Sequence, residues 1–291
     1  MTMSKTFTGG LLAAAMVAGA AFADPSLWHI EDEDSDIYIF GTVHILRPEL
    51  EWQTDEMMSA FESADTVYFE APVNDPAEAA NLQQVLMANA LNPAGTTLSS
   101  LVSAEAWRQI ETFAPRIGVS AAQLEPLRPW LATIQLGVGF IIISGYDPQS
   151  GVEATLWPLA REAGKTLAYF ETVEEQIGFF ANLPTEIETA LLEETVADFE
   201  AAPDQLDTLV AAWAAGDQAM IDDVMNAQMR QDAPEVHDII IVQRNHRWAD
   251  QIEDILDGSG TVFIAVGSGH LPGDEGVISL LRQRDITVSG P

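Results

Sequence analysis

The stretch "IFGTVHILRP", residues 39–48, shows where one buried strand ends and which side chain follows it. An apolar run of the length and composition typical of a strand closes here, and His44 comes three residues after a turn-forming glycine, Gly41. The stretch "VFIAVGSGHLPG", residues 262–273, repeats the arrangement with His270, so two of the five histidines follow a strand in a Gly-x-x-His pattern. A single histidine in this position more often caps a loop than takes part in chemistry. The repetition favours a functional role for both.

Further apolar runs extend this pattern to a sheet surrounded by helices. The run before His44 is preceded by "SLWHI" and an acidic turn, which predicts a hairpin, and two more runs end on Glu70 and Glu171. Helical spacing predicts helices at 49–64, about 76–163 and 173–257, and the chain closes on a predicted strand, "DITVS" at 285–289. Because the strands lie at the two ends of the chain, we expect one α/β domain over residues 24–291. It has a mixed, largely parallel central sheet, flanking helices and a helical insertion.

The four polar residues that follow strands predict a site at one edge of the sheet. In an open α/β sheet the carboxyl ends of parallel strands form the crevice where ligands bind. If the strands are neighbours, His44, Glu70, Glu171 and His270 converge there. The chain has no cysteine, so two imidazoles and a carboxylate would suit a divalent transition metal held by nitrogen and oxygen. Such a metal lowers the pKa of a bound water, and a nearby carboxylate can take the proton, which indicates hydrolysis.

Other basic residues have a weaker context. Arg244 and Asn245 lie on a predicted helix whose cations could bind a carboxylate or stabilise an oxyanion, although a salt-bridged helix is the simpler interpretation in an acidic protein. His29 and His237 lack a convergent context and are expected to be structural, and His246 is expected at the surface.

Composition excludes several classes of function. A formal charge of −33 with only two lysines argues against a nucleic-acid binder and against binding to anionic membranes. Residues 1–23 resemble a cleavable signal peptide, with Lys5 before an apolar run and an Ala-x-Ala site, so cleavage after Ala23 and a periplasmic or secreted protein are expected. The apolar stretch at 129–146 is short and contains Gln135, which favours a buried helix or a pocket wall over a membrane span.

Taken in order, the segments "FGTVHILRPE", "ADTVYFEAPV", "GKTLAYFETVEEQIGFF", "VQRNHRWADQI" and "VFIAVGSGHLPGDEGVISLLRQRDITV" resemble the TraB/PrgY/GumN family, which includes the TIKI metalloproteases of animals. The resemblance covers essentially the whole mature chain. It implies an erythromycin-esterase-like α/β fold and a metal-dependent hydrolase, most directly a peptidase.

On matching positions the resemblance implies His44, Glu70 and His270 as ligands of a divalent metal such as Mn, Co or Zn, with Glu70 also as a base. It further implies that Arg244 and Asn245 are active-site neighbours and that Glu171 has a positioning role. Relatives tend to carry aspartate where Glu153 stands in "GVEATL", a departure from the family pattern.

Two alternatives remain at this stage. The same crevice could belong to a non-catalytic binding protein of an envelope or exopolysaccharide system that captures a peptide, a saccharide or a metal-bearing ligand. Hydrolysis could also proceed without a metal, with one histidine as the base.

Overall fold

The sheet is ordered so that the last strand of the chain lies at its centre. In this computed structural model, which describes residues 24–197, 199 and 202–291, five strands take the order β1-β2-β5-β3-β4. β1 (Leu27–Glu31) is antiparallel to β2 (Ser35–Thr42), and the pairs β2 with β5 (Gly260–Gly267), β5 with β3 (Thr66–Phe69) and β3 with β4 (Thr166–Tyr169) are parallel. The predicted α/β class with a mixed, mostly parallel sheet is therefore confirmed.

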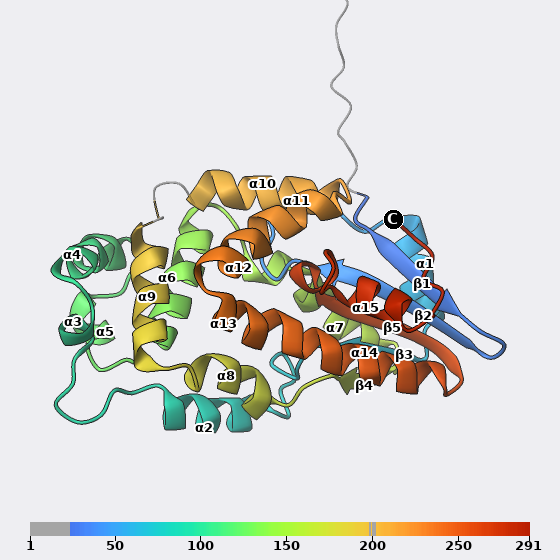
Figure 1. Cartoon of the computed structure of the whole chain (residues 1–291), viewed down its shortest axis with the longest axis horizontal. Coiled ribbons are helices and arrows are strands. Elements are labelled where there is room, and N and C mark those ends of the chain that lie inside the picture. Colours follow the sequence, from blue (N-terminus) through green and yellow to red (C-terminus); the bar gives the residue numbers. More distant parts are fainter. Residues whose placement is uncertain (1–23, 198, 200–201) are drawn as a thin grey trace, which may run out of the picture.

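Helices cover both faces of the sheet and build a lobe beside it (Figure 1). Their bounds are α1 (Asp55–Ser63), α2 (Ala79–Asn89), α3 (Leu98–Leu101), α4 (Ala104–Phe113), η1 (Ala114–Ile117), α5 (Ala121–Leu124), α6 (Pro129–Ile143), η2 (Pro148–Ser150), α7 (Val152–Glu162), α8 (Val173–Ala181), α9 (Thr185–Ala197), α10 (Ala202–Ala214), α11 (Gln218–Asp222), η4 (Asp223–Ala227), α12 (Gln228–Asp232), α13 (Pro234–His237), η5 (Asp238–Val242), α14 (Gln243–Leu256), η6 (Ser268–His270) and α15 (Val277–Gln283). The segments η4 and η5 are π-helical.

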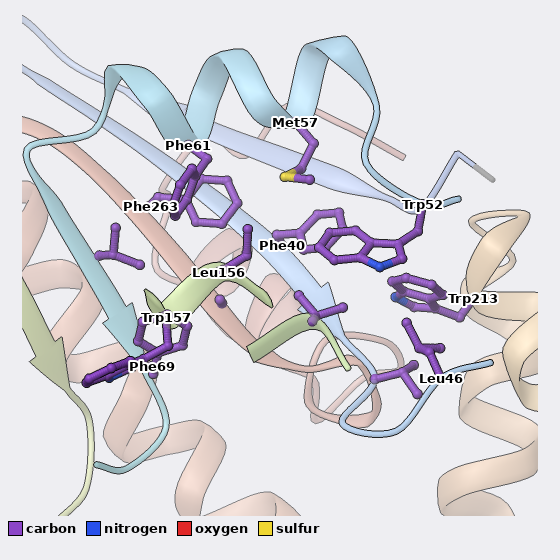
Figure 2. Packing of buried hydrophobic residues seen from close by; sticks show 14 of the residues in the cluster. Phe40, Leu46, Trp52, Met57, Phe61, Phe69, Leu156, Trp157, Trp213 and Phe263 are labelled. Carbon is purple, nitrogen blue, oxygen red and sulfur yellow. The ribbon is translucent and has the colours of Figure 1, made fainter. Parts of the chain in front are cut away.

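Strand periodicity sends alternate side chains into two cores. On one face Phe40 of β2 and Phe263 of β5 join a cluster beneath α1 and α7, where Figure 2 shows Met57 and Phe61 of α1 reaching down to them. On the other face the alternate residues, such as Ile39, pack against α14 and α15. Both faces are thus fixed by packing, which leaves the carboxyl edge of the parallel strands free to carry chemistry.

The lobe has an apolar core of its own. Leu136 and Phe140 of α6 pack there with residues of α4 and α9, including Ile110 and Leu192. The apolar stretch at 129–146 forms the helix α6, which buries one side, including Leu136 and Phe140, and exposes Ile134, Ile142 and Ile143, so the predicted burial holds only in part. Among the described residues no helix is both long and apolar enough to cross a membrane, and the predicted signal peptide lies outside the described residues.

Two predicted elements differ from the structure. The helix expected at 49–64 begins only at Asp55, because the Thr54 side chain accepts the Met57 backbone N–H and caps the helix there. The closing strand predicted at 285–289 is wrong. Only Ser289 pairs with β1, through an isolated bridge to His29, because the chain turns at Asp285 with φ of 62° and reaches β1 for a single residue.

Candidate functional site

The four predicted side chains lie in one row along the carboxyl edge of the sheet. His44 follows β2, His270 follows β5, Glu70 follows β3 and Glu171 follows β4, and these strands are parallel neighbours in that order. Neighbouring strands are about 4.8 Å apart, so the row spans about 14 Å. The predicted convergence is confirmed at this level. Glu70, Glu171 and His270 are buried and form what we call the buried cluster, whereas His44 is exposed.

Arg244 of α14 holds the buried cluster together. Its Nε and Nη2 donate to the two oxygens of Glu171 at 2.8 and 2.9 Å, and Nη2 also donates to Glu70 Oε2 at 2.7 Å. Its Nη1 donates to Ile240 O at 3.1 Å and to His270 Nε2 at 3.0 Å. All five N–H groups of the guanidinium are therefore used. In this arrangement Arg244 has no donor left for a substrate, and its predicted role at an active site stays a prediction.

Glu70 is a fixed carboxylate. Its Oε1 accepts the Gly267 backbone N–H at 2.7 Å, and its Oε2 also accepts from Gln176 Nε2 at 3.2 Å. Burial alone would raise the pKa of Glu70, but the charge of Arg244, the charges that His270 and His44 carry when protonated, and the Gly267 N–H lower it to about 2. A Cβ at Gly267 would lie 2.9 Å from Glu70 Oε1, so this approach requires glycine. Its low pKa makes Glu70 a weak base.

His270 is held as one neutral tautomer. Asn245 Nδ2 donates to Glu275 O at 2.8 Å, so its Oδ1 faces His270 Nδ1 at 2.6 Å and must accept a proton from it. The Nε2 atom then accepts from Arg244. Burial, followed by the charge of Arg244, lowers the pKa of His270 to about 3. This ring is neutral at physiological pH, and both of its nitrogens are already hydrogen-bonded.

Glu171 closes the cluster at the β4 end. Besides Arg244, its Oε1 accepts from Trp248 Nε1 at 3.0 Å. Burial raises the pKa of Glu171, and the bidentate contact with Arg244 opposes this. The positioning role predicted for Glu171 agrees with these contacts.

His44 lies at the other end of the row and is the accessible member. Its side chain is 64% exposed, and Nδ1 lies 2.8 Å from Oε1 of the largely buried Glu153 of α7. Because a carboxylate only accepts, Nδ1 carries the proton and Nε2 is directed away from the pair. The same Glu153 oxygen accepts from Thr42 Oγ1, whereas Oε2 is buried without a partner.

The charge of Glu153 raises the pKa of His44 to about 9, and desolvation opposes this. The backbone supports the pair. A Cβ at Gly151, the N-cap of α7, would lie 1.9 Å from His44 O. Glycine therefore lets α7 begin close enough to place Glu153 against the imidazole.

The arrangement does not fit a metal ion held by the three predicted ligands. Arg244 takes up His270 Nε2 and Glu70 Oε2, and His44 Nδ1 faces Glu153. The described residues do include three metal-type side chains whose donor atoms all lie within 4.8 Å of one another. That group does not contain His44, Glu70 or His270. The assignment of His44, Glu70 and His270 as ligands therefore stays a prediction.

The group that could hold a metal ion lies at the surface of the β1–β2 hairpin. It consists of His29, Glu31 and Asp36, and His29 Nε2 lies 2.9 Å from Asp36 Oδ1. His29 also stacks on Tyr38 at a centroid distance of 4.5 Å. The sequence interpretation of His29 as structural did not anticipate this clustering, which depends on the hairpin register.

The structure adds residues that sequence reasoning missed. Glu153 drew attention only as a departure from the family pattern, and its pairing with His44 was not foreseen. Gln176 and Trp248 contact Glu70 and Glu171, yet they lie on amphipathic helices and carry no signal of their own.

Comparisons with known proteins agree with this architecture. A relative from Treponema pallidum (strain Nichols), an uncharacterized protein, is 23% identical over 271 residues, which cover 88% of this chain and 80% of the relative. No solved structure matches significantly. The model of the TraB/PrgY/gumN family matches residues 26–290, which include His44, Glu70, Glu171, Arg244 and His270. The chain therefore belongs to the TraB/PrgY/gumN family.

Proposed function

We propose that this chain is a hydrolase, and specifically a peptidase, in which His44 activates the attacking water. One observation carries the proposal: His44 is the exposed member of the row, and the carboxylate of Glu153 fixes its tautomer. A carboxylate that orients an imidazole is the arrangement used for general acid–base catalysis. The neighbouring charges of Glu70 and Arg244 are held rigidly, so the electrostatic environment of the imidazole is preorganised.

The proposed reaction follows from the tautomer. Neutral His44 accepts a proton from water through Nε2 while the water oxygen attacks the carbonyl carbon of the substrate. The imidazolium then donates this proton to the leaving amine, and the peptide C–N bond breaks. Glu153 stabilises the imidazolium between the two steps. His44 is the catalytic residue in this scheme, and Glu153 is a positioning residue.

The buried cluster supplies rigidity in this proposal. Glu70 ties the end of β3 to the last residue of β5, and Arg244 connects the ends of β3, β4 and β5. Asn245 keeps His270 in the tautomer that accepts from Arg244. These side chains therefore act as positioning residues that hold the carboxyl edge in one geometry.

Activity measurements with matched histidine variants test the proposal. The mature chain is incubated with a fluorogenic peptide library, beside His44→Gln and the exposed His246→Gln as a control. General acid–base catalysis contributes about 10²–10⁴-fold, so His44→Gln should lose at least about 100-fold while His246→Gln keeps full activity. An inactive wild type that nevertheless retains peptides would favour the binding-protein alternative, and an unimpaired His44→Gln would refute the role of His44.

Chelation separates this mechanism from the metal-dependent one predicted by resemblance. Activity that survives exhaustive chelation supports water activation by His44 alone. Activity that is lost and is restored by Mn, Co or Zn would instead support His44, Glu70 and His270 as ligands in an arrangement different from the present one.

Export to the periplasm or the exterior, with cleavage after Ala23, is part of the proposal. The family match begins at residue 26, which is compatible with a mature chain that starts at Asp24. The amino-terminal sequence of the protein recovered from its native cell fraction tests this. A chain that retains residues 1–23 would contradict cleavage.

A further inference from the structure

A cavity of about 510 Å³ lies beside the buried cluster, between α8 and the η5–α14 segment. Phe179, Leu183 and Ile239 give it an apolar lining, and Arg247, Glu174 and Glu175 are the charged residues that line it. The volume is within the range typical of sites for small ligands, about 300–1,000 Å³. None of the residues predicted from the sequence lines this cavity.

On both helices that form it, the cavity is one helical turn from a residue that contacts Glu70 in the row of strand ends. On α8, Gln176 contacts Glu70, and Phe179 one turn later lines the cavity. On α14, Arg244 contacts Glu70, and Arg247 one turn later lines the cavity. One turn is about 5 Å, the length of one to two residues of an extended peptide. A peptide lying along the row of strand ends can therefore place a terminal residue there.

Arg247 differs from Arg244 in having free donors. In the part of the chain that the structure describes, its one acidic neighbour within ion-pair distance is Glu171 Oε1 at 3.8 Å, and it makes no hydrogen bond. That oxygen already accepts from Arg244 and Trp248. The Arg247 side chain is 44% exposed, and its guanidinium lies 5.3 Å from the centroid of the Phe179 ring. Stacking thus holds a planar fork of unused N–H groups beside the cavity.

We propose that this cavity is a substrate subsite that binds the carboxyl-terminal residue of a peptide, and this rests on the proposed peptidase function. The free carboxylate pairs with the Arg247 fork, whose planar geometry matches a carboxylate. An apolar side chain packs on Phe179, Leu183 and Ile239. In a chain of net charge −33, an anionic group needs such a local cation to bind at all.

Glu174 and Glu175, which also line the cavity, affect which terminal residue it can bind. Glu175 folds back, since its Oε2 accepts the Thr172 N–H at 2.8 Å, whereas Glu174 is exposed on the first turn of α8. Both carry negative charge beside the cavity and repel a second carboxylate. The subsite therefore selects an apolar terminal residue over an acidic one.

Calorimetry with three peptides tests the subsite on the whole mature chain. The probes are an N-acetylated tripeptide ending in leucine with a free carboxylate, the same peptide as its amide, and an amidated tripeptide ending in glutamate. A charge-assisted pair should make the free acid bind about 10-fold more tightly than its amide. The glutamate amide should show no such advantage. Equal affinity for acid and amide, absence of binding, or a glutamate amide as tight as the free acid would overturn the proposal.

Matched arginine variants identify the group responsible. Arg247→Gln should remove the preference for the free acid. Arg116→Gln should retain it, because Arg116 stacks at the same 5.3 Å on Phe113 in the lobe, away from the cavity. Thermal unfolding of both variants verifies that they fold.

The test of the subsite can fail independently of the test of the proposed hydrolase function. His44→Gln that binds the free acid normally but does not cleave leaves the subsite intact. Cleavage by a wild type without any preference for the free acid would overturn the subsite and leave the hydrolase proposal standing.

Discussion

Replacement of Glu153 by glutamine isolates the electrostatic part of the His44–Glu153 pair. Glutamine keeps an oxygen that can accept from His44 Nδ1, but removes the negative charge. That charge is the largest cause of the His44 pKa of about 9, against an ordinary value of about 6.5. At pH 7.5 the neutral fraction of His44 would be roughly 3% with the first pKa and roughly 90% with the second. The variant should therefore titrate at lower pH.

Because the pKa of His44 is raised in the folded protein, the free energy of unfolding also depends on pH. The folded pKa of His44 lies above the unfolded value, so the pair stabilises the fold fully below about pH 6.5, and this contribution is lost as the pH rises towards about 9. Because the ring is largely exposed, water screens part of the attraction and the measured midpoint of the wild type can fall below 9. The prediction tested is therefore that the pKa of His44 is raised, not its exact value.

Proton NMR of the imidazole resonances measures both predictions, with His44→Gln to assign the signal. The wild-type midpoint should lie at least about one pH unit above that of Glu153→Gln. Glu162→Gln, an exposed change on the same helix, should leave it unaltered. If the hydrolase proposal holds, the rising limb of the pH–rate profile shifts with the NMR midpoint. Equal midpoints in the wild type and Glu153→Gln would refute the reasoning.

Three further substitutions test the parts around this pair. Gly267→Ala places a methyl group 2.9 Å from Glu70 Oε1 and should cost about 1–3 kcal/mol in urea unfolding; an unchanged midpoint would show that the approach is not tight. Arg244→Met leaves Glu70 and Glu171 buried without their cation and should cost about 3–5 kcal/mol by the same measurement at pH 7, and a neutral result would contradict its role as the centre of the cluster. Phe263→Ala removes a fully buried ring between the sheet and α1 and should cost about 3–5 kcal/mol in calorimetric or urea unfolding, with a loss below 1 kcal/mol counting against the packing described.

The row of strand ends could be predicted because its signals are local. An apolar run and a following polar residue are adjacent in sequence, and the parallel pairing of β2, β5, β3 and β4 then brings His44, His270, Glu70 and Glu171 to one edge. The same local logic was wrong for residues 285–289. Their apolar alternation has the period of a strand, but only Ser289 pairs with β1.

The division of the site into a buried cluster and the exposed His44 could not be predicted, because it depends on contacts between residues far apart in sequence. Whether Arg244 meets a substrate or saturates its donors is decided by how α14 lies over β3 and β4. The pairing of His44 with Glu153 depends on the start of α7 passing against the loop after β2. Neither arrangement has a periodic signature, so both require the folded chain.

The central place of β5 makes the carboxyl edge of the sheet a late product of synthesis. Until Gly260–Gly267 is available, β2 and β3 have no strand between them, and the backbone N–H that receives Glu70 does not exist. A chain interrupted before residue 260 would expose two unpaired edges, which are prone to join other chains. Such a fragment should aggregate, and the row of strand ends should become complete in a single step when the final strand closes the gap.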